Sequence, residues 1–211
     1  MPAGAAVTVT GDPQSGFYPV VYNGTSGWAS GDFITFGGGG DPGGGGGGSG
    51  IIFPFTGGTW TVIQGHNGGT HQNRSGFAQY YYALDWARTD GNTAGQPIYA
   101  PASGTIGFND RGSGGLAIEM GNGHTVAMFH VTFDAGGLGY GQYVTQGQYL
   151  GYISGPGGAG YASTPHVDMT LWQGTGQSHS AAPFSGSNAI SGVSFPDIGG
   201  WNQHYGVTVN P

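Results

Sequence analysis

The sequence predicts an all-β protein in which one large antiparallel sheet folds over into a sandwich, with a small incomplete β unit at the N-terminus. Glycine makes up 49 of the 211 residues, and only 6% of the residues are charged, against about a quarter in an average globular chain. Short runs rich in valine, tyrosine and threonine alternate with glycine-rich turns, as in β-strands joined by tight connections. Helix formers are scarce, because the chain has no lysine and Glu119 is its only glutamate.

The first part of the chain contains short strand-like runs at residues 6–10, 16–22, 27–28 and 32–36. Asn23-Gly24, between two of these runs, is a strong signal for a two-residue hairpin turn. The pattern resembles the later strands of a bacterial Src-homology-3-like domain and covers about the last half of one. A sheet without its first strand leaves a pairing edge open. We therefore expect this edge to pack on the main domain or to join another copy of the chain in a homo-oligomer.

Residues 37–50 consist almost entirely of glycine and have the composition of a flexible linker. The predicted organisation is therefore a β segment at 1–36, a glycine-rich linker at 37–50 and one domain at 51–211. Within that domain, residues 98–108 are expected to form two strands and residues 115–131 a hairpin around Gly121-Asn122-Gly123. Further strands are predicted at 80–86, 142–144, 148–153, 167–172 and 206–209, and the rest of 173–211 is expected to be loosely structured.

The charge of the chain excludes several classes of function. The formal net charge is −7, and the basic residues are only three arginines. Nucleic acid is not an expected partner, because neutralising phosphates requires clustered lysine and arginine.

The sequence predicts no membrane span, because it contains no run of 18 apolar residues. The absence of cysteine excludes disulfides and a thiol nucleophile. Residues 1–6 carry no recognisable export signal, so for a secreted protein we expect the signal upstream or of another kind.

The residues that best indicate chemistry lie between 60 and 100. His66 and His71 occupy a Gly/Asn/Thr-rich stretch, and Asp85 follows within the apolar run from Tyr80 to Trp86. A carboxylate in an apolar run is costly to bury unless it is paired or binds a metal, and histidine and aspartate are both zinc ligands. On these residues alone, two interpretations stay open. Asp85 could cap a turn beside solvated histidines, or the residues could form a metal site.

Four segments together resemble the lysostaphin-type (LytM-like) zinc metallopeptidases of bacterial peptidoglycan. The first is Tyr-Ala-Leu-Asp-Trp-Ala at 82–87 together with the run from Gly95 to Gly104. The others are the strand that ends at His130, the hairpin at 144–155, and Thr-Pro-His-Val-Asp at 164–168. The resemblance covers about residues 60–175 in matching order and spacing. It implies that Asp85 is a zinc ligand and that His130 and His166 are catalytic.

Two positions depart from the family pattern. Tyr81 stands four residues before Asp85, where many members have the first ligand, so that role falls to His71 or, less favourably, His66. Asp168 stands where the family has its third ligand, a histidine. Zinc accepts a carboxylate oxygen at nearly the same distance as an imidazole nitrogen, and residues two apart in a strand share a face. The resemblance thus implies one zinc per chain on His71, Asp85 and Asp168, although an oxygen-rich site could also take manganese or calcium.

The resemblance implies a zinc endopeptidase that cleaves peptide bonds of peptidoglycan, outside the cell or in its envelope. Without a glutamate near the site, His130 and His166 would orient and deprotonate the water. The alternative is a catalytically degenerate member that binds the wall or assembles into filaments. The aromatic content also suggests a third function, a carbohydrate-binding sandwich. The remaining histidines, His124, His179 and His204, are expected to be structural or solvated.

Overall fold

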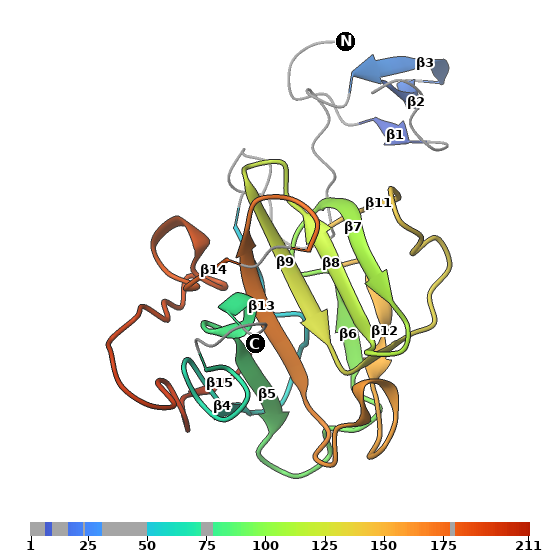
Figure 1. Cartoon of the computed structure of the whole chain (residues 1–211). Coiled ribbons are helices and arrows are strands. Elements are labelled where there is room, and N and C mark those ends of the chain that lie inside the picture. Colours follow the sequence, from blue (N-terminus) through green and yellow to red (C-terminus); the bar gives the residue numbers. More distant parts are fainter. Residues whose placement is uncertain (1–6, 10–16, 23, 31–49, 73–77, 178–179) are drawn as a thin grey trace. The chain divides into compact units, whose positions relative to one another are not determined.

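The computed structural model describes residues 7–9, 17–22, 24–30, 50–72, 78–177 and 180–211 (Figure 1). The chain divides into two compact units, Met1–Gly47 and Gly48–Pro211. The expected glycine-rich linker lies outside the described residues except for Gly50, so the predicted domain boundaries stay a prediction.

The first unit contains a three-stranded antiparallel sheet in the order β1-β2-β3. Its strands are β1 (Thr8–Val9), β2 (Phe17–Tyr22) and β3 (Thr25–Ser30). The predicted hairpin is present, because Tyr22 pairs with Thr25 and Gly24 has a φ of +77°, which favours glycine. The strand expected at 32–36 lies outside the described residues. The Src-homology-3-like character of this unit stays a prediction.

The second unit is built on a nine-stranded sheet, in which the main order is β11-β7-β8-β9-β13-β5-β4-β15 and β14 pairs with β13. Every pairing in it is antiparallel, which confirms the predicted fold class. The strands are β4 (Trp60–Gln64), β5 (Leu84–Arg88), β7 (Gly104–Asp110), β8 (Gly115–Glu119), β9 (His124–Phe129), β11 (Tyr143–Val144), β13 (Val167–Gln173), β14 (Ala181–Ala182) and β15 (Thr208–Val209).

A second, three-stranded sheet in this unit has the order β10-β12-β6. It consists of β6 (Pro97–Tyr99), β10 (Val131–Phe133) and β12 (Tyr149–Ile153). The helical elements in the described part of the chain are the short 3-10 turns η2 (Ala78–Tyr80), η3 (Ala159–Tyr161) and η4 (Gly186–Asn188). None of the described helices is long and apolar enough to cross a membrane.

The main core lies between the two sheets, and side-chain alternation decides which residues enter it. Successive residues of a strand point to opposite faces, so every second residue of the central strands is apolar and buried. The core residues from these strands are Leu84 and Trp86 on β5, Leu116 and Ile118 on β8, Val126 and Met128 on β9, and Val167, Met169 and Leu171 on β13, which pack with Ile98, Val131, Phe133, Leu150 and Ile153 of the smaller sheet.

The opposite face of the nine-stranded sheet carries a smaller apolar cluster and the polar residues of interest. Ala117, Ala127, Phe129 and Trp172 form this cluster, with Phe108 and Tyr80 packed against it. Asp85 and Asp168 lie on strands β5 and β13, between residues that face the main core. Strand alternation therefore directs both carboxylates to the face away from the main core.

Two local predictions were wrong. The run from Tyr80 to Trp86 is not one strand, because residues 78–80 form the η2 turn and β5 begins at Leu84. The closing segment is also less loose than expected. Its Phe184, Ile190 and Phe195 are almost fully buried in the main core, so burial orders a segment that contains few strands.

Candidate metal centre

The two carboxylates of the candidate site are brought together by the pairing of β5 with β13. Asp168 lies directly opposite Asp85 in the antiparallel register, and both residues are buried. Directly opposite residues in such a pair have Cβ atoms about 5 Å apart on the same face. Two buried like charges at this spacing repel each other, so they require a cation or a proton between them.

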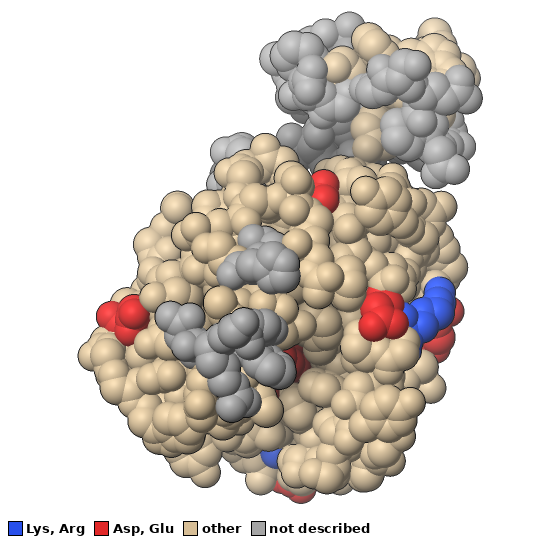
Figure 2. Space-filling model, in the orientation of Figure 1, with Lys and Arg blue, Asp and Glu red and all other residues tan. Residues whose placement is uncertain are grey.

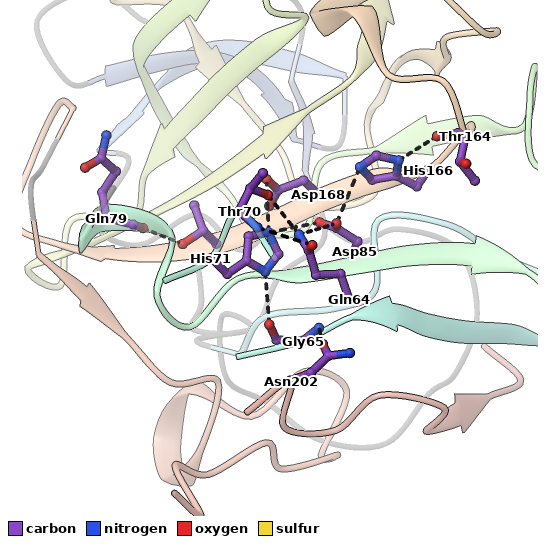
Figure 3. A network of polar contacts seen from close by, with 11 residues as sticks. Gln64, Gly65, Thr70, His71, Gln79, Asp85, Thr164, His166, Asp168 and Asn202 are labelled. Atoms are coloured by element: carbon purple, nitrogen blue, oxygen red, sulfur yellow. Dashed lines mark hydrogen bonds and ion pairs between the residues drawn. The ribbon is translucent and has the colours of Figure 1, made fainter. Parts of the chain in front are cut away.

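His71 supplies the third group, from the loop that follows β4. Its Nε2 atom lies 3.2 Å from Asp85 Oδ1 and 3.8 Å from Asp168 Oδ2 (Figure 3). One potential ligand atom from each of the three residues lies within 4.8 Å of the others. The group His71, Asp85 and Asp168 could therefore hold a metal ion.

The other ring nitrogen of His71 fixes how the ring presents Nε2. Nδ1 lies 3.1 Å from the Gly65 carbonyl oxygen, which can only accept, so Nδ1 carries a proton and donates. In the neutral ring, Nε2 then has a free lone pair directed at the carboxylates. Burial alone would lower the pKa of His71, but hydrogen bonds and charges from Asp168 and Asp85 raise that pKa to about 10. Without a metal, a proton on Nε2 thus provides the positive charge between the carboxylates.

Gln64, at the end of β4, supports both sides of the site. Its Nε2 donates to Asp85 Oδ2 at 3.0 Å and to Thr70 Oγ1 at 2.9 Å. Its Oε1 accepts from the Thr70 backbone N–H at 3.4 Å. Gln64 therefore links the carboxylate on β5 to the loop residue that precedes His71. Hydrogen bonds of this kind around metal ligands orient the ligands and adjust their basicity.

The oxygen atoms of Asp168 provide a test of whether the residues fit a metal ion. Asp168 Oδ1 is buried and has no hydrogen-bond partner among the residues that the structure describes. A buried carboxylate oxygen without a partner is costly, and a cation would satisfy it. One imidazole and two carboxylates are a donor set that zinc accepts. The residues present therefore fit a divalent metal ion.

His166 lies at the edge of the carboxylate pair. Its Nδ1 is 2.7 Å from the Thr164 carbonyl oxygen, and its Nε2 is 3.6 Å from Asp85 Oδ2 (Figure 3). Because the carbonyl can only accept, Nδ1 carries the proton and Nε2 of the neutral ring is free to accept another. His166 and Asp168 are two residues apart, and both side chains reach the same site.

His130 lies between β9 and β10, where the chain passes from the larger sheet to the smaller one. Its φ of +64° is in the left-handed region, which costs a non-glycine residue of order 1–3 kcal/mol and is frequent at functional sites. The His130 and His166 ring centroids lie 4.5 Å apart. Burial lowers the pKa of His130, partly offset by Asp168. His130 is therefore neutral at pH 7.

Of the two histidines left open as the first ligand, only His71 contacts the carboxylates. The ring of His66 is fully buried beside Tyr82 and His204, with centroid distances of 5.2 Å and 4.7 Å. His204 Nε2 lies 2.8 Å from the Pro196 carbonyl, in agreement with a structural role. His179 lies outside the described residues. Glu119 is not part of the cluster of His71, Asp85 and Asp168, and its Oε1 accepts from the Gly176 N–H at 2.6 Å.

A pocket of about 300 Å3 opens beside the carboxylates and His130. Figure 2 shows that charged side chains are sparse on the drawn face of the molecule and that acidic ones predominate. The residues lining the pocket are Thr70, His71, Tyr80, Phe108, Asp110, Ser113, Phe129, His130, Gly160, Asp168 and Gln177.

Sequence reasoning missed the residues that support this site. Gln64 and Thr164 contact Asp85 and His166, and Asn202 binds the backbone of Gly65 at 2.7 Å. Gln64 and Thr164 lie close to predicted site residues along the chain, so their position was a usable signal. Asn202 lies in the segment expected to be loose, and no local pattern connects it to His71.

Comparison with solved structures finds proteins that are similar to this chain at sequence identities of 20% or less and TM-scores below 0.5. The M23 metalloprotease pseudoalterin from the deep sea is 19% identical, with 67% of this chain and 86% of that chain covered and a TM-score of 0.47. The catalytic domain of the prophage-encoded M23 protein EnpA from Enterococcus faecalis is 18% identical, with 63% of this chain and 94% of that chain covered and a TM-score of 0.46. The catalytic domain of lysostaphin from Staphylococcus simulans is 20% identical, with 60% of this chain and 87% of that chain covered and a TM-score of 0.42.

The chain is similar to M23 peptidases. No family model matches the sequence, and no curated protein matches it.

Proposed function

We propose that this chain is a zinc metallo-endopeptidase that hydrolyses peptide bonds of bacterial peptidoglycan, outside the cell or in its envelope. The observation that carries the proposal is the buried convergence of His71 Nε2 with carboxylate oxygens of Asp85 and Asp168 within 4.8 Å. Two carboxylates and a neutral imidazole balance the charge of a divalent cation and leave a coordination position for water or substrate.

The three residues would hold one Zn2+ in this arrangement. When bound, the ion would act as a Lewis acid that polarises a peptide carbonyl and lowers the pKa of water toward ~7. The open pocket beside Asp168 and His130 would admit the peptide to this position.

His166 and His130 would carry the proton chemistry. His166 Nε2 would accept the proton of the attacking water, because the hydrogen bond from Nδ1 to Thr164 leaves Nε2 as the basic nitrogen. An N–H of the neutral His130 would donate to the oxygen on which negative charge develops. The 4.5 Å separation of the two rings lets both act on one bound peptide.

Metal analysis combined with an activity assay tests the proposal. Protein purified without added metal, then supplied with zinc and desalted, should contain about one zinc per chain. It should release peptides from purified peptidoglycan. Chelation should abolish that release and the His130→Ala substitution should reduce it at least about a hundredfold, while the fold persists by circular dichroism. Release that survives both treatments would refute the mechanism.

One observation favours a second candidate, a metal-free member of this fold that binds the wall or assembles into filaments. His71 Nε2 lies 3.2 Å from Asp85 Oδ1 and Gln64 Nε2 donates to Asp85 Oδ2 at 3.0 Å, so a protonated His71 and the Gln64 amide would satisfy part of the carboxylate pair without a metal. For this function, no zinc should bind even when it is supplied in excess. Sedimentation over a wide concentration range would then reveal assembly, or binding to peptidoglycan would replace hydrolysis.

A further inference from the structure

The pocket beside the candidate metal centre follows one row of paired residues that crosses neighbouring strands of the sheet. Asp85 pairs with Asp168, Asp168 pairs with Phe129, and Asp110 pairs with Gly115. Gly115 lies next to Phe129, since a Cβ at Gly115 would lie 2.7 Å from Phe129 Cε1. The row therefore runs from the carboxylate pair on β5 and β13, across β9 and β8, to Asp110 at the end of β7.

Strand spacing gives the length of this row. Asp168 and Asp110 are separated by three strand intervals, or roughly 14 Å between backbones. Both residues line the same pocket, so their side chains lie at two ends of one space. The space is therefore longer than the reacting peptide group alone requires, and it leaves room for a neighbouring side chain.

The middle of the pocket is apolar and aromatic. Phe129 lies with its ring centroid 5.4 Å from that of Tyr80 and 6.2 Å from that of Phe108, and all three rings line the pocket. The Phe129 ring lies over Gly115, because a Cβ at Gly115 would be only 2.7 Å from Phe129 Cε1 and 2.8 Å from Phe129 Cδ1. Such a surface favours an aliphatic stem, and aromatic faces also attract a cation that lies above them.

The far end of the pocket is negatively charged. Asp110 is exposed, and its Oδ1 accepts from the Gly112 N–H at 2.9 Å. Its neighbour Arg111 is directed to the Phe133 carbonyl at 2.7 Å, and no ion pair between Arg111 and Asp110 is formed. No arginine is among the described residues that line the pocket, and the chain has no lysine.

We propose that this pocket binds a substrate side chain that has an aliphatic stem and ends in a primary amine, as lysine does. The stem lies over Phe129 and Phe108, and the ammonium group binds the Asp110 carboxylate. This inference rests on the proposed function, because the side chain in the pocket would belong to the substrate residue next to the cleaved peptide bond. Asp110 is then a specificity-determining residue that selects for positive charge.

A pair of matched peptides tests the inference by binding alone. The probes are a blocked pentapeptide with one central lysine among glycines and the same peptide with Nε-acetyl-lysine. Titration calorimetry with the full chain without added metal should show the lysine peptide binding about threefold to fivefold more tightly, as an ion pair with an exposed carboxylate would give. The preference should decrease with added salt.

Substitution of Asp110 assigns the effect to this residue. In Asp110→Asn the preference should fall below about twofold, because asparagine keeps an oxygen for the Gly112 N–H but loses the charge. The control Asp134→Asn removes an exposed carboxylate that is not among the described lining residues, and it should keep the preference. Equal binding of both peptides by the wild type, or an unchanged preference in Asp110→Asn, would overturn the inference.

The proposed function is assayed separately with the same peptides and zinc-loaded protein. Cleavage of the lysine peptide in preference to its acetylated form would support both proposals. A binding preference that depends on Asp110 without cleavage of either peptide would support the amine site and count against the peptidase function.

Discussion

Asn202 accepts a hydrogen bond from the backbone N–H of Gly65 at 2.7 Å, across 137 residues of sequence. The carbonyl of the same Gly65 lies 3.1 Å from His71 Nδ1. The backbone of Gly65 therefore links Asn202, in the C-terminal part of the chain, to the ring of the candidate metal ligand His71 (Figure 3). Asn202 thus acts on a candidate metal ligand through the backbone of Gly65.

This relationship predicts that Asn202 controls metal affinity. Asn202→Gly tolerates the φ of +51° at this position but removes the side-chain oxygen, so the loop that carries His71 loses a constraint. We expect zinc affinity to fall about tenfold to a hundredfold, as for other residues that orient metal ligands. Competition with a zinc-binding dye measures the change. Asn202→Asp keeps an acceptor oxygen and should bind zinc far more tightly than Asn202→Gly; equal affinities in the two variants would contradict the assignment.

Substitutions of Asp168 should show whether its side chain coordinates the zinc ion. Asp168→Ala removes a ligand atom and should reduce zinc content from about one per chain to a small fraction of that value. Asp168→His replaces one acceptable zinc ligand with another, so it should retain zinc. Elemental analysis of both variants after desalting gives the comparison. Full zinc content in Asp168→Ala would place the metal elsewhere.

His166 and His130 should affect catalysis without holding the metal. Because positioned acid–base groups contribute typically 10²–10⁴-fold, His166→Ala and His130→Ala should each reduce the rate of peptide release by that order while zinc content stays near one. His124→Ala is a suitable control, since His124 lies at the start of β9, six residues before His130. Loss of zinc in His166→Ala would instead identify His166 as a ligand.

His66 should make the protein sensitive to acid. Burial lowers its pKa to about 3, with a further contribution from His204 and an opposing one from Asp197. The unfolded chain takes up a proton at His66 as the pH falls through about 6.5, whereas the folded chain does so only near 3. The stability from neutral His66 is therefore complete above pH 6.5 and decreases below it, by about 1.4 kcal/mol per pH unit.

Replacement of His66 by phenylalanine tests this prediction. Neither ring nitrogen of His66 has a hydrogen-bond partner among the described residues, so the substitution sacrifices no hydrogen bond of the ring. Urea unfolding between pH 4 and 8 should show that the variant loses less stability on acidification than the wild type. Parallel stability curves for the two proteins would show that His66 is not the group responsible.

Strand alternation explains why much of the fold could be predicted from sequence. The hairpin from Gly115 to Phe129 follows from its apolar alternation and from the turn at 121–123, which the structure retains with Glu119 paired to Thr125. The assignment of Asp85 to a strand was correct, although the strand begins later than expected. Local side-chain chemistry and turn geometry are sufficient for such features because they involve residues close in the chain.

The candidate site was predictable only in part. The spacing of His166 and Asp168 predicts that both reach one face, and the structure brings them near Asp85. The choice between His66 and His71 could not be made from sequence, because both lie in the same glycine-rich stretch. It depends on how Gln64 and Asn202 hold the loop, and those contacts form only when β4, β5 and the C-terminal segment meet.

The sequence by itself determined the all-β class, the alternating faces of the central strands and the residue types available for a metal site. These properties follow from composition and from periodicities of two residues. Only the tertiary structure decided which histidine faces the carboxylates, that Phe184 and Phe195 enter the core, and that Asp110 lies in one row with Asp168. Each of these depends on the register between strands and on packing of distant segments, which local sequence patterns do not encode.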